Sequence, residues 1–505
     1  MATFVDSGQA LFDLLIEIRN SKKKIAMCHG VFDLLHPGHL EHFHQASNLA
    51  DVLIVSTTAD NFVNKGPGRP VFDLHTRMLA ISRIKGVDHV IASNHPTALQ
   101  NLELVKPDFY VKGSDYNNFS NDITGMIDKE AEYVSSYGGQ IYFTSGFTSS
   151  STMLINNSLL SQDSDIRKWV RNFREKWSLD ETLYWIDKMK EVEVNVLGET
   201  IIDIYTACKP LAKSSKDPIL AFHRFETDKF PGGVLAIGDS CEKWSKKTTV
   251  FSASGEDLEN HLAEIPRKWD FDLRLVTTHD RPTIAKHRYY DVNSGNRVFE
   301  HYDFNPEPLS QESQSELIHG IEGRLEKDAV FLIADYGHGL FTEVLIDKLV
   351  KSNSFLAVNT QANAGNRGFN TIAKYPRIDF LSLNGGELEL ELRKKNLNYG
   401  EVVPEIMSVK KSRNAVLTLG GDGLLTFDEN KDMCWTPAFA SKVVDKVGAG
   451  DSVLAVASIL SSLRAPKEII GLISSVVAAF EVAQLGHAKS LDIITLKKNI
   501  KGLLG

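Results

Sequence analysis

The feature that most constrains this chain is a regular alternation of short apolar runs with helix-like stretches, which occurs twice. From Lys24 the runs IAMCHGVF, DVLIVSTT, VDHVIA and DFYVKGSDY are separated by HLEHFHQASNLA, LHTRMLAISRI and TALQNLELVK. A second series opens at VEVNVLGETIID and continues through VFLIADY, FLAVNT, DFLSLN and AVLTLGG to an alanine-rich helical section. Strands that alternate with helices form βαβ units around a parallel sheet. We therefore expect an α/β fold in both parts.

The chain divides where the alternation pauses. Residues 158–190 are polar and charged, lack Gly and Pro, and carry Trp169, Phe173 and Trp177 at helical spacing, which predicts a helical connector. The 505 residues also exceed the roughly 250–300 that one hydrophobic core usually serves. We predict an N-terminal domain at 1–157, the connector at 158–190 and a C-terminal domain at 191–505.

Charge and composition exclude several classes of function. The net charge of -9 argues against broad nucleic-acid binding, which needs a basic surface. No run of about 18 apolar residues predicts a membrane span, and the N-terminus lacks the basic and apolar pattern of a signal peptide. The four cysteines are scattered without a CxxC pair. We expect a cytoplasmic protein with neither nucleic acid nor membrane as its partner.

The stretch CHGVFDLLHPGHLEHF, residues 28–43, predicts a phosphate site. A strand ends here and a helix begins, and a helix N-terminus offers unpaired N–H groups and partial positive charge to an anion. His36 and His39 are three residues apart, so both rings can face the same side. Gly38 between them lets a ligand approach the backbone.

Two other interpretations of these histidines remain open. His42 and His44 are of the kind that usually lies at the surface or hydrogen-bonded in a core. His29, His36, His39 and His42 could instead ligate zinc. Structural zinc histidines seldom flank a Pro-Gly turn between strand and helix, so we favour phosphate and assign no residue to a metal.

HGVFDLLHPGH resembles the HxGH signature of the nucleotidylyltransferase superfamily. NKGPGRPVFDLHTRMLAI, KPDFYVKGSDY and GGQIYFTSGFTSSSTMLI follow in the order of its cytidylyltransferase-like branch, closest to the transferase half of the bifunctional heptose-phosphate kinase and adenylyltransferase family. The resemblance implies a Rossmann-like domain in which a sugar phosphate attacks the α-phosphorus of ATP or CTP, with Mg²⁺, and pyrophosphate leaves.

The same resemblance implies roles for individual residues. His36, His39 and Lys65 would be catalytic, by holding the triphosphate and stabilising its charge. The implied nucleotide-binding residues are Gly30, Phe32, Asp33, Lys112, Gly113, Asp115, Ser149, Ser150 and Ser151. Serines before an apolar run are also ordinary helix N-caps.

A second glycine turn stands in VVDKVGAGDSVLAVASIL, residues 443–460. Gly448, Ala449 and Gly450 open a helix, so their N–H groups can hold an oxyanion, and Asp451 follows at the helix start. A carboxylate beside an anion site can accept the proton of an attacking hydroxyl.

FPGGVLAIGDS, TIAKHRYY, IADYGHG, LSLNGGELEL and LTLGGDGLLTF stand in the order of the ribokinase-like (PfkB) carbohydrate kinases. This resemblance implies a ribokinase-like α/β domain with Asp451 as catalytic base. Nucleotide and Mg²⁺ would be bound near Asn384, Glu387, Gly420, Gly423, Gly448, Ala449 and Gly450, and the sugar near Asp203, Gly232, Gly233 and Lys286.

Several residues depart from the kinase pattern. Ala236 stands where the family has asparagine, and Val447 replaces the usual threonine before GAGD. Asn359 and Gln361 lie where the family has Asp-Pro-Lys. The lost asparagine removes one hydroxyl contact, so we expect a substrate related to heptose 7-phosphate and not identical with it.

Together the resemblances imply a bifunctional enzyme of nucleotide-sugar biosynthesis with the kinase domain second. Its ligands would be a sugar phosphate and nucleoside triphosphates: ATP for the kinase, ATP or CTP for the transferase. We expect a homo-oligomer, a dimer. In the alternative, only the transferase is active and the kinase-like domain is a non-catalytic sugar-binding or dimerisation module.

Overall fold

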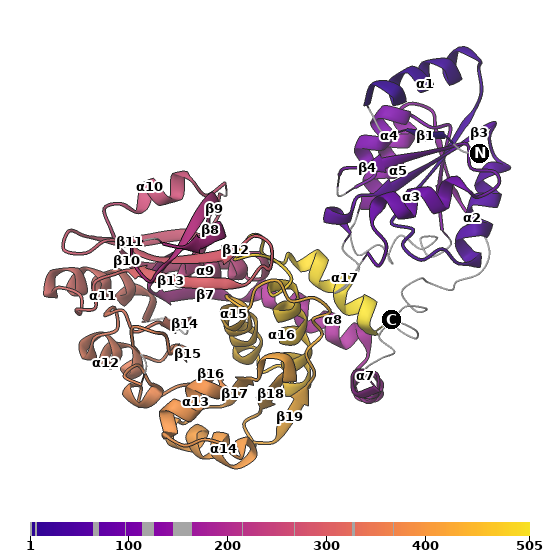
Figure 1. Ribbon diagram of the computed structural model, residues 1–505. Helices are drawn as coiled ribbons and strands as arrows, with labels where there is room; N and C mark the ends of the chain where they lie inside the picture. The colour runs from indigo at the N-terminus through magenta and orange to yellow at the C-terminus, as the bar shows by residue number, and fades with distance from the viewer. Residues whose placement is uncertain are drawn as a thin grey trace. The chain divides into compact units, whose positions relative to one another are not determined.

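The computed structural model describes residues 3–5, 8–63, 70–95, 97–113, 126–144, 164–214, 216–266, 268–325, 329–366 and 368–504. The chain forms two compact units, one made of Met1–Val170 with Lys497–Gly505 and the other of Arg171–Leu496. Both are built on parallel sheets with helices, which confirms the α/β prediction (Figure 1). Among the described helices, none has the length and apolar character needed to cross a bilayer.

The N-terminal unit is a six-stranded parallel sheet in the order β1-β4-β3-β2-β5-β6. The expected alternation is present, and one pair of elements, β1 and α1, precedes it. The elements are β1 (Thr3–Val5), α1 (Gly8–Asn20), β2 (Ile25–Gly30), α2 (Pro37–Ser47), β3 (Val52–Thr58), α3 (Leu74–Ser82), β4 (His89–Ser93), α4 (Leu99–Val105), β5 (Phe109–Lys112), α5 (Met126–Ser136) and β6 (Gln140–Phe143).

Two hydrophobic clusters cover the two faces of this sheet. Ile25 and Met27 of β2 pack in a cluster with α1, α4 and α5. Ala26 and Cys28, which alternate with them, pack in a second cluster with α2 and α3. A strand buried on both faces reads as a continuous apolar run, which explains why IAMC shows no alternation of polar and apolar residues.

The chain reverses its direction of winding at β2. Strands β3 and β4 lie on one side of β2, and β5 and β6 lie on the other. In open α/β sheets, ligands bind at the carboxyl ends of the strands beside such a point. The predicted phosphate site at His36 and His39 follows β2, so the topology positions it there.

Two helices occupy the described part of the predicted connector. Helix α7 (Ser164–Lys176) ends shortly before α8 (Leu179–Lys188) begins. Ser178 caps α8 in a capping box with Glu181, whose carboxylate accepts from the Ser178 N–H at 2.8 Å. Reciprocal capping satisfies N–H groups that a continuous helix would not leave open.

The C-terminal unit is built on a nine-stranded sheet in the order β11-β10-β7-β14-β15-β16-β17-β18-β19, parallel from β11 to β17 and antiparallel at β18 and β19. Its strands are β7 (Glu193–Gly198), β10 (Lys247–Gly255), β11 (Asp272–Thr278), β14 (Val330–Asp335), β15 (Phe355–Thr360), β16 (Phe380–Asn384), β17 (Asn414–Thr418), β18 (Leu424–Phe427) and β19 (Met433–Thr436). Its helices are α9 (Val234–Trp244), α10 (Leu258–Ala263), α11 (Gln311–Leu325), α12 (Glu343–Lys351), α13 (Gly385–Leu392), α14 (Tyr399–Lys410), α15 (Ala449–Ser462) and α16 (Lys467–Glu481). The last helix, α17 (Ile493–Leu504), begins in this unit, and from Lys497 on its residues belong to the N-terminal unit.

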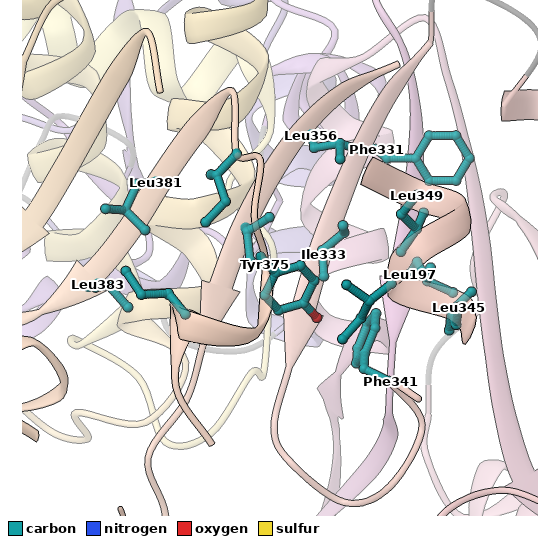
Figure 2. Packing of buried hydrophobic residues seen from close by; sticks show 14 of the residues in the cluster. Leu197, Phe331, Ile333, Phe341, Leu345, Leu349, Leu356, Tyr375, Leu381 and Leu383 are labelled. Carbon is teal, nitrogen blue, oxygen red and sulfur yellow. The ribbon is translucent and has the colours of Figure 1, made fainter. Parts of the chain in front are cut away.

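One face of this sheet carries a large core. Figure 2 shows Leu345 and Leu349 of α12 beside Phe331 and Ile333 of β14, in a cluster that also takes residues from α11, α13 and α14. Helices α9, α15 and α16 pack on the sheet without contributing to this cluster, so they cover the other face. Asp451, in the first turn of α15, interacts with Tyr336, which follows β14, and with Glu387, which follows β16, so the N-terminus of α15 lies at the carboxyl ends of these two strands.

A separate four-stranded sheet, β13-β12-β8-β9, completes the unit. It contains β8 (Thr200–Lys213), β9 (Leu220–Gly233), β12 (Ile284–Asp291) and β13 (Arg297–Asp303). The alternation of runs predicts only the start of β8, because the last five residues of β8 and the middle of β9 are exposed and form no apolar run. This small sheet contributes Asp203, Gly232, Gly233 and Lys286, the residues predicted to bind sugar.

Candidate functional sites

The two predicted histidines of the N-terminal unit lie together. Their ring centroids are 3.9 Å apart with an interplanar angle of 30°. The Phe32 ring contacts that of His39 edge-on, with centroids 5.4 Å apart. Phe32 has a positive φ of 50°, which directs the loop after β2 back over the helix start. The two imidazoles therefore share one side of the α2 N-terminus.

His36 is the N-cap of α2, and Pro37 follows as the first helical residue. Its Nδ1 accepts a hydrogen bond from the Gly38 N–H at 3.1 Å. Since Nδ1 accepts, the proton of a neutral ring is on Nε2. His36 thus satisfies one N–H of the helix start, and a protonated Nε2 is the type of donor that a phosphate oxygen accepts from.

Asp33 organises the loop. Its carboxylate accepts from the Val71 N–H at 2.8 Å and the Phe72 N–H at 3.1 Å. The fully buried Arg77 of α3 donates to the Val31 carbonyl at 2.6 Å and the Thr58 carbonyl at 2.8 Å. Arg77 was not among the predicted residues, because a single arginine in a helical run gives no signal of burial.

The neighbouring histidines are hydrogen-bonded inside the protein. His29 Nδ1 is 3.0 Å from Ser56 Oγ, and His42 Nδ1 is 3.0 Å from Thr144 Oγ1. Burial, with the charge of Lys112, lowers the pKa of His29 to about 3 and that of His42 to about 4. Both rings are therefore neutral at pH 7, and each is hydrogen-bonded to a side chain of the same unit.

The remaining predicted residues of this site are only partly described. Lys112, at the end of β5, forms an ion pair with Glu130 at 2.8 Å and lies over the Tyr110 ring. A Cβ at Gly113 would meet open space, whereas one at Gly30 would touch the Phe32 ring. Lys65, Asp115, Ser149, Ser150 and Ser151 lie outside the described residues.

In the C-terminal unit, Asp451 lies in the first turn of α15 behind the turn of Gly448. Gly448 has a φ of 83°, which a side chain would strain, and a Cβ there would come within 3.0 Å of Glu481 Oε1. Ala449 and Gly450 begin the helix, so their N–H groups are among those without an intrahelical partner. The geometry suits an anion bound beside the Asp451 carboxylate.

The surroundings of Asp451 adjust its acidity. Burial raises the pKa of Asp451 to about 6, against the opposing effects of the Tyr336 hydroxyl and the Lys286 ammonium. A carboxylate with a pKa nearer neutrality is a better proton acceptor than an ordinary aspartate and is still ionised at pH 7.

The predicted sugar residues converge across β8, β9 and β12. Asp203 is paired in register with Lys286 and forms a buried ion pair with Arg288. A Cβ at Gly232 would lie 2.6 Å from Asp203 Oδ2, so glycine is needed there to let the carboxylate approach. Gly233, with a φ of 55°, is the N-cap of α9.

Lys286 is a second buried cation of this cluster, beside Arg288. Its Nζ lies 5.5 Å from the Tyr302 ring centroid and 5.4 Å from that of Tyr336. Burial lowers its pKa, and Asp203 opposes the shift. A cavity of about 450 Å³ is lined by residues at or next to β12 and β13, among them Thr283, Ala285, Tyr302 and Phe304.

Three further residues of the cluster were not predicted. Glu199, at the β7–β8 junction, accepts from the N–H groups of Tyr336 and His338 at 3.0 Å each. His338 is 1% exposed and neither ring nitrogen has a hydrogen-bond partner. Burial, with Lys286, lowers its pKa to about 3, so the ring is neutral. IADYGHG contains two of these residues, but only their position at the end of β14 reveals their role.

Asn384 and Glu387, predicted near Mg²⁺, form the capping box of α13. The Asn384 side chain accepts from the Glu387 N–H, and Glu387 Oε2 accepts from the Asn384 N–H, both at 2.8 Å. Burial raises the pKa of Glu387 to about 7, and the nearby Asp451 charge adds to the shift. The structure thus brings Glu387 toward Asp451 and gives it a structural role as well.

Gly420 and Gly423 flank the turn between β17 and β18. A Cβ at Gly420 would meet nothing within 4 Å, which leaves its surface open. Gly423 has a φ of 88°, and a Cβ there would collide with the Thr436 carbonyl of β19. The close approach of the Thr436 carbonyl, at the end of β19, therefore explains why residue 423 is a glycine.

The departures from the kinase pattern are accommodated inside the unit. Ala236 is buried in α9, and the Asn359 amide donates to the Ser382 carbonyl at 2.8 Å. The Gln361 N–H donates to the Asp335 carbonyl, and the Val447 N–H donates to Asp445 Oδ1 at 3.0 Å.

A buried charged network underlies the glycine turn. His487 Nδ1 is 2.9 Å from Glu481 Oε1, and its Nε2 is 3.0 Å from Asp239 Oδ2. Burial alone would lower the pKa of His487, but the two carboxylates overcome it and raise that pKa to about 9. Glu481, which touches the Gly448 turn, is thus neutralised by an imidazolium.

Comparison with known families assigns both units. Residues 27–157 match the cytidylyltransferase-like family, and residues 193–493, more than half of the chain, match the pfkB family of carbohydrate kinases. The chain belongs to the pfkB carbohydrate kinase family. This pfkB family member carries in addition a cytidylyltransferase-like domain, which confirms the combination that the motifs predicted.

Relatives and solved structures agree with this assignment. The chain is 40% identical to the bifunctional protein HldE of Helicobacter hepaticus over 114 residues, which cover 22% of this chain and 23% of the relative. It is 36% identical to the bifunctional protein HldE of Pseudomonas savastanoi over 148 residues, 29% and 30% of the two chains. The matches thus span less than a third of these relatives' length. Escherichia coli phosphofructokinase-2, solved with substrates and products, has the same fold at a TM-score of 0.50 and 16% identity, over 62% of this chain and 99% of that one.

Proposed function

We propose that this protein is a bifunctional enzyme of nucleotide-sugar biosynthesis, in which residues 191–505 phosphorylate a sugar or sugar phosphate and residues 1–157 couple a sugar phosphate to a nucleotide. The observation that carries the proposal is Asp451, whose pKa of about 6 and position behind the Gly448 turn suit a general base beside an anion site. The alternative of a non-catalytic kinase-like domain is not favoured, because that arrangement is retained.

In the kinase, Asp451 would take the proton of a sugar hydroxyl as the oxygen attacks the γ-phosphorus of ATP. The N–H groups at the start of α15 would hold the phosphoryl oxygens, since they have no partner in the helix. Lys286, buried beside Asp451, would stabilise the charge that develops on transfer. Catalysis of this kind is mostly positioning and electrostatics.

The residues present fit Mg²⁺. Glu387 is a buried carboxylate near Asp451, and Mg²⁺ is commonly held by one or two carboxylates, retained waters and substrate phosphates. Because both Glu387 oxygens accept backbone N–H groups, Glu387 would bind through coordinated water. Bound Mg²⁺ supplies neutralisation of phosphate charge.

In the transferase, His36 and His39 would hold the triphosphate of ATP or CTP while a phosphate oxygen attacks the α-phosphorus and pyrophosphate leaves. The two adjacent imidazole rings and the helix N-terminus place donors on one side of the site. Lys65 would add a positive charge, and Lys112, Gly113, Asp115 and Ser149–Ser151 would contact the nucleotide.

The sugar would bind against His338. Burying an imidazole whose two nitrogens have no hydrogen-bond partner costs desolvation free energy that no hydrogen bond offsets. A bound sugar hydroxyl would supply the missing hydrogen bonds. Asp203 and Lys286 lie in the same cluster. Since Ala236 offers no polar group, the preferred sugar would differ from heptose 7-phosphate in the hydroxyl that asparagine contacts.

The test uses the full chain in two assays: sugar-dependent ADP formation, and pyrophosphate release across four nucleotides and a panel of phosphorylated sugars. Asp451→Asn should remove the first activity and leave the second on a pre-phosphorylated sugar. His39→Ala should do the reverse. Absence of ADP formation with every sugar, while pyrophosphate release persists, would establish the transferase-only alternative.

We also propose that the protein is cytoplasmic and a homodimer. Three of its four cysteines are buried and all four are free, as suits a reducing compartment. Sedimentation of the purified chain tests the dimer.

A further inference from the structure

A cluster of metal-ligating side chains lies on the small sheet. His287 of β12 and His301 of β13 face each other in register, and their rings stack with centroids 4.1 Å apart at 11°. Asp303, two residues along β13, places Oδ2 at 3.0 Å from His287 Nε2. Among the residues that the structure describes, these three form the one group whose possible ligand atoms all lie within 4.8 Å of one another.

We propose that His287, His301 and Asp303 form a binding site for a zinc-class transition-metal ion. Two imidazoles and one carboxylate are the ligands that Zn²⁺ takes when it keeps a fourth position open. Metal–ligand bonds near 2.1 Å place ligand atoms about 3.4 Å apart in a tetrahedron, so small side-chain rotations would complete the site. Mg²⁺ prefers oxygen ligands and is a poor match for two nitrogens.

The backbone holds these ligands in place. Residues directly opposite in an antiparallel pair, and those two positions along, share a face of the sheet. Next to the histidines, Tyr289 and Phe299 stack at 4.1 Å and extend the same row. The His287 side chain is 21% exposed and that of Asp303 is 54% exposed, so an ion can reach both from solvent.

The site would stabilise the strand that carries kinase residues. Side chains alternate along β12, so Lys286 and Arg288 lie on the face opposite His287. Strand β13 is at the edge of the sheet, where only β12 pairs with it. A metal ion bound by His287, His301 and Asp303 would link β13 to β12 and thereby restrain Lys286 and Arg288 on β12.

The test is a Zn²⁺ titration of the full chain with excess Mg²⁺, using a chromophoric zinc indicator as competitor. We expect one ion per chain at this site. His301→Gln, His287→Gln and Asp303→Asn should each weaken it by at least about 100-fold, because even changes outside the ligand set cost 10–100-fold. His319→Gln, at a histidine with a 90% exposed side chain on α11, is the matched control and should bind normally.

Two further measurements complete the test. Thermal melts establish that each variant is folded, which the exposed His301 should allow. His36→Gln tests whether zinc binds the N-terminal histidines instead. Binding that survives His301→Gln, that is lost only in His36→Gln, or that is absent from the unaltered chain overturns the proposal.

Discussion

Because His487 and Glu481 form a buried pair, we expect the free energy of unfolding to fall as the pH becomes alkaline. The folded protein raises the pKa of His487 from 6.5 to about 9, so the folded state binds a proton that the unfolded chain releases above pH 6.5. The stabilisation is therefore complete below the unfolded pKa and is lost as pH rises through about 9. With one pKa unit equal to 1.36 kcal/mol, about 2–3 kcal/mol of stability should disappear between pH 7 and 9.5.

The assay is urea unfolding at several pH values, followed by tryptophan fluorescence. Trp244 suits it, because this indole is fully buried and donates to the Leu491 carbonyl, close in sequence to His487. Glu481→Gln preserves shape and removes the carboxylate that raises the pKa most, so the loss should move to lower pH. An NMR titration of the His487 ring gives the pKa directly.

One result would refute this reasoning. If stability is level between pH 7 and 9.5 and the His487 ring titrates near 6.5, the imidazole is not held as a cation. The Glu481 charge beneath the Gly448 turn would then be uncompensated. The electrostatic account of the anion site would fail with it.

Three other changes have defined outcomes. His36→Ala or His39→Ala should reduce pyrophosphate release by about 10²–10³-fold and leave ADP formation intact, since each removes one preorganised group; near-normal release would end the phosphate-site interpretation. Kinase kcat should rise with pH through about 6 as Asp451 ionises, and Asp451→Asn should lower it by about 10²–10⁴-fold; a rate independent of pH between 5 and 8 would exclude this base. Gly423→Ala should destabilise the C-terminal unit by at least about 1–2 kcal/mol in urea unfolding, because of its positive φ and the collision with Thr436, and an unchanged midpoint would contradict both reasons.

Much of the fold could be predicted because its central strands are buried on both faces and so appear as apolar runs. The small sheet could not, since β9 is largely exposed and its pairing with β8 joins residues such as Asp203 and Phe230 that no local pattern relates. Asp451 could be predicted because the glycine turn before it is visible in the sequence, whereas His338 has no such local signal. Burial of a polar ring depends on neighbours brought by other strands.

The alternation of side chains along β12 limits which insertions and deletions this part of the chain can tolerate. Lys286 and Arg288 lie on one face and His287 and Tyr289 on the other, so inserting or deleting one residue within β12 would exchange the two sets. Cations would then leave the kinase site, and histidines would enter it. The turn at 292–296 lies beyond both sets and can change length without that exchange. Variation in length between these strands should therefore be confined to that turn.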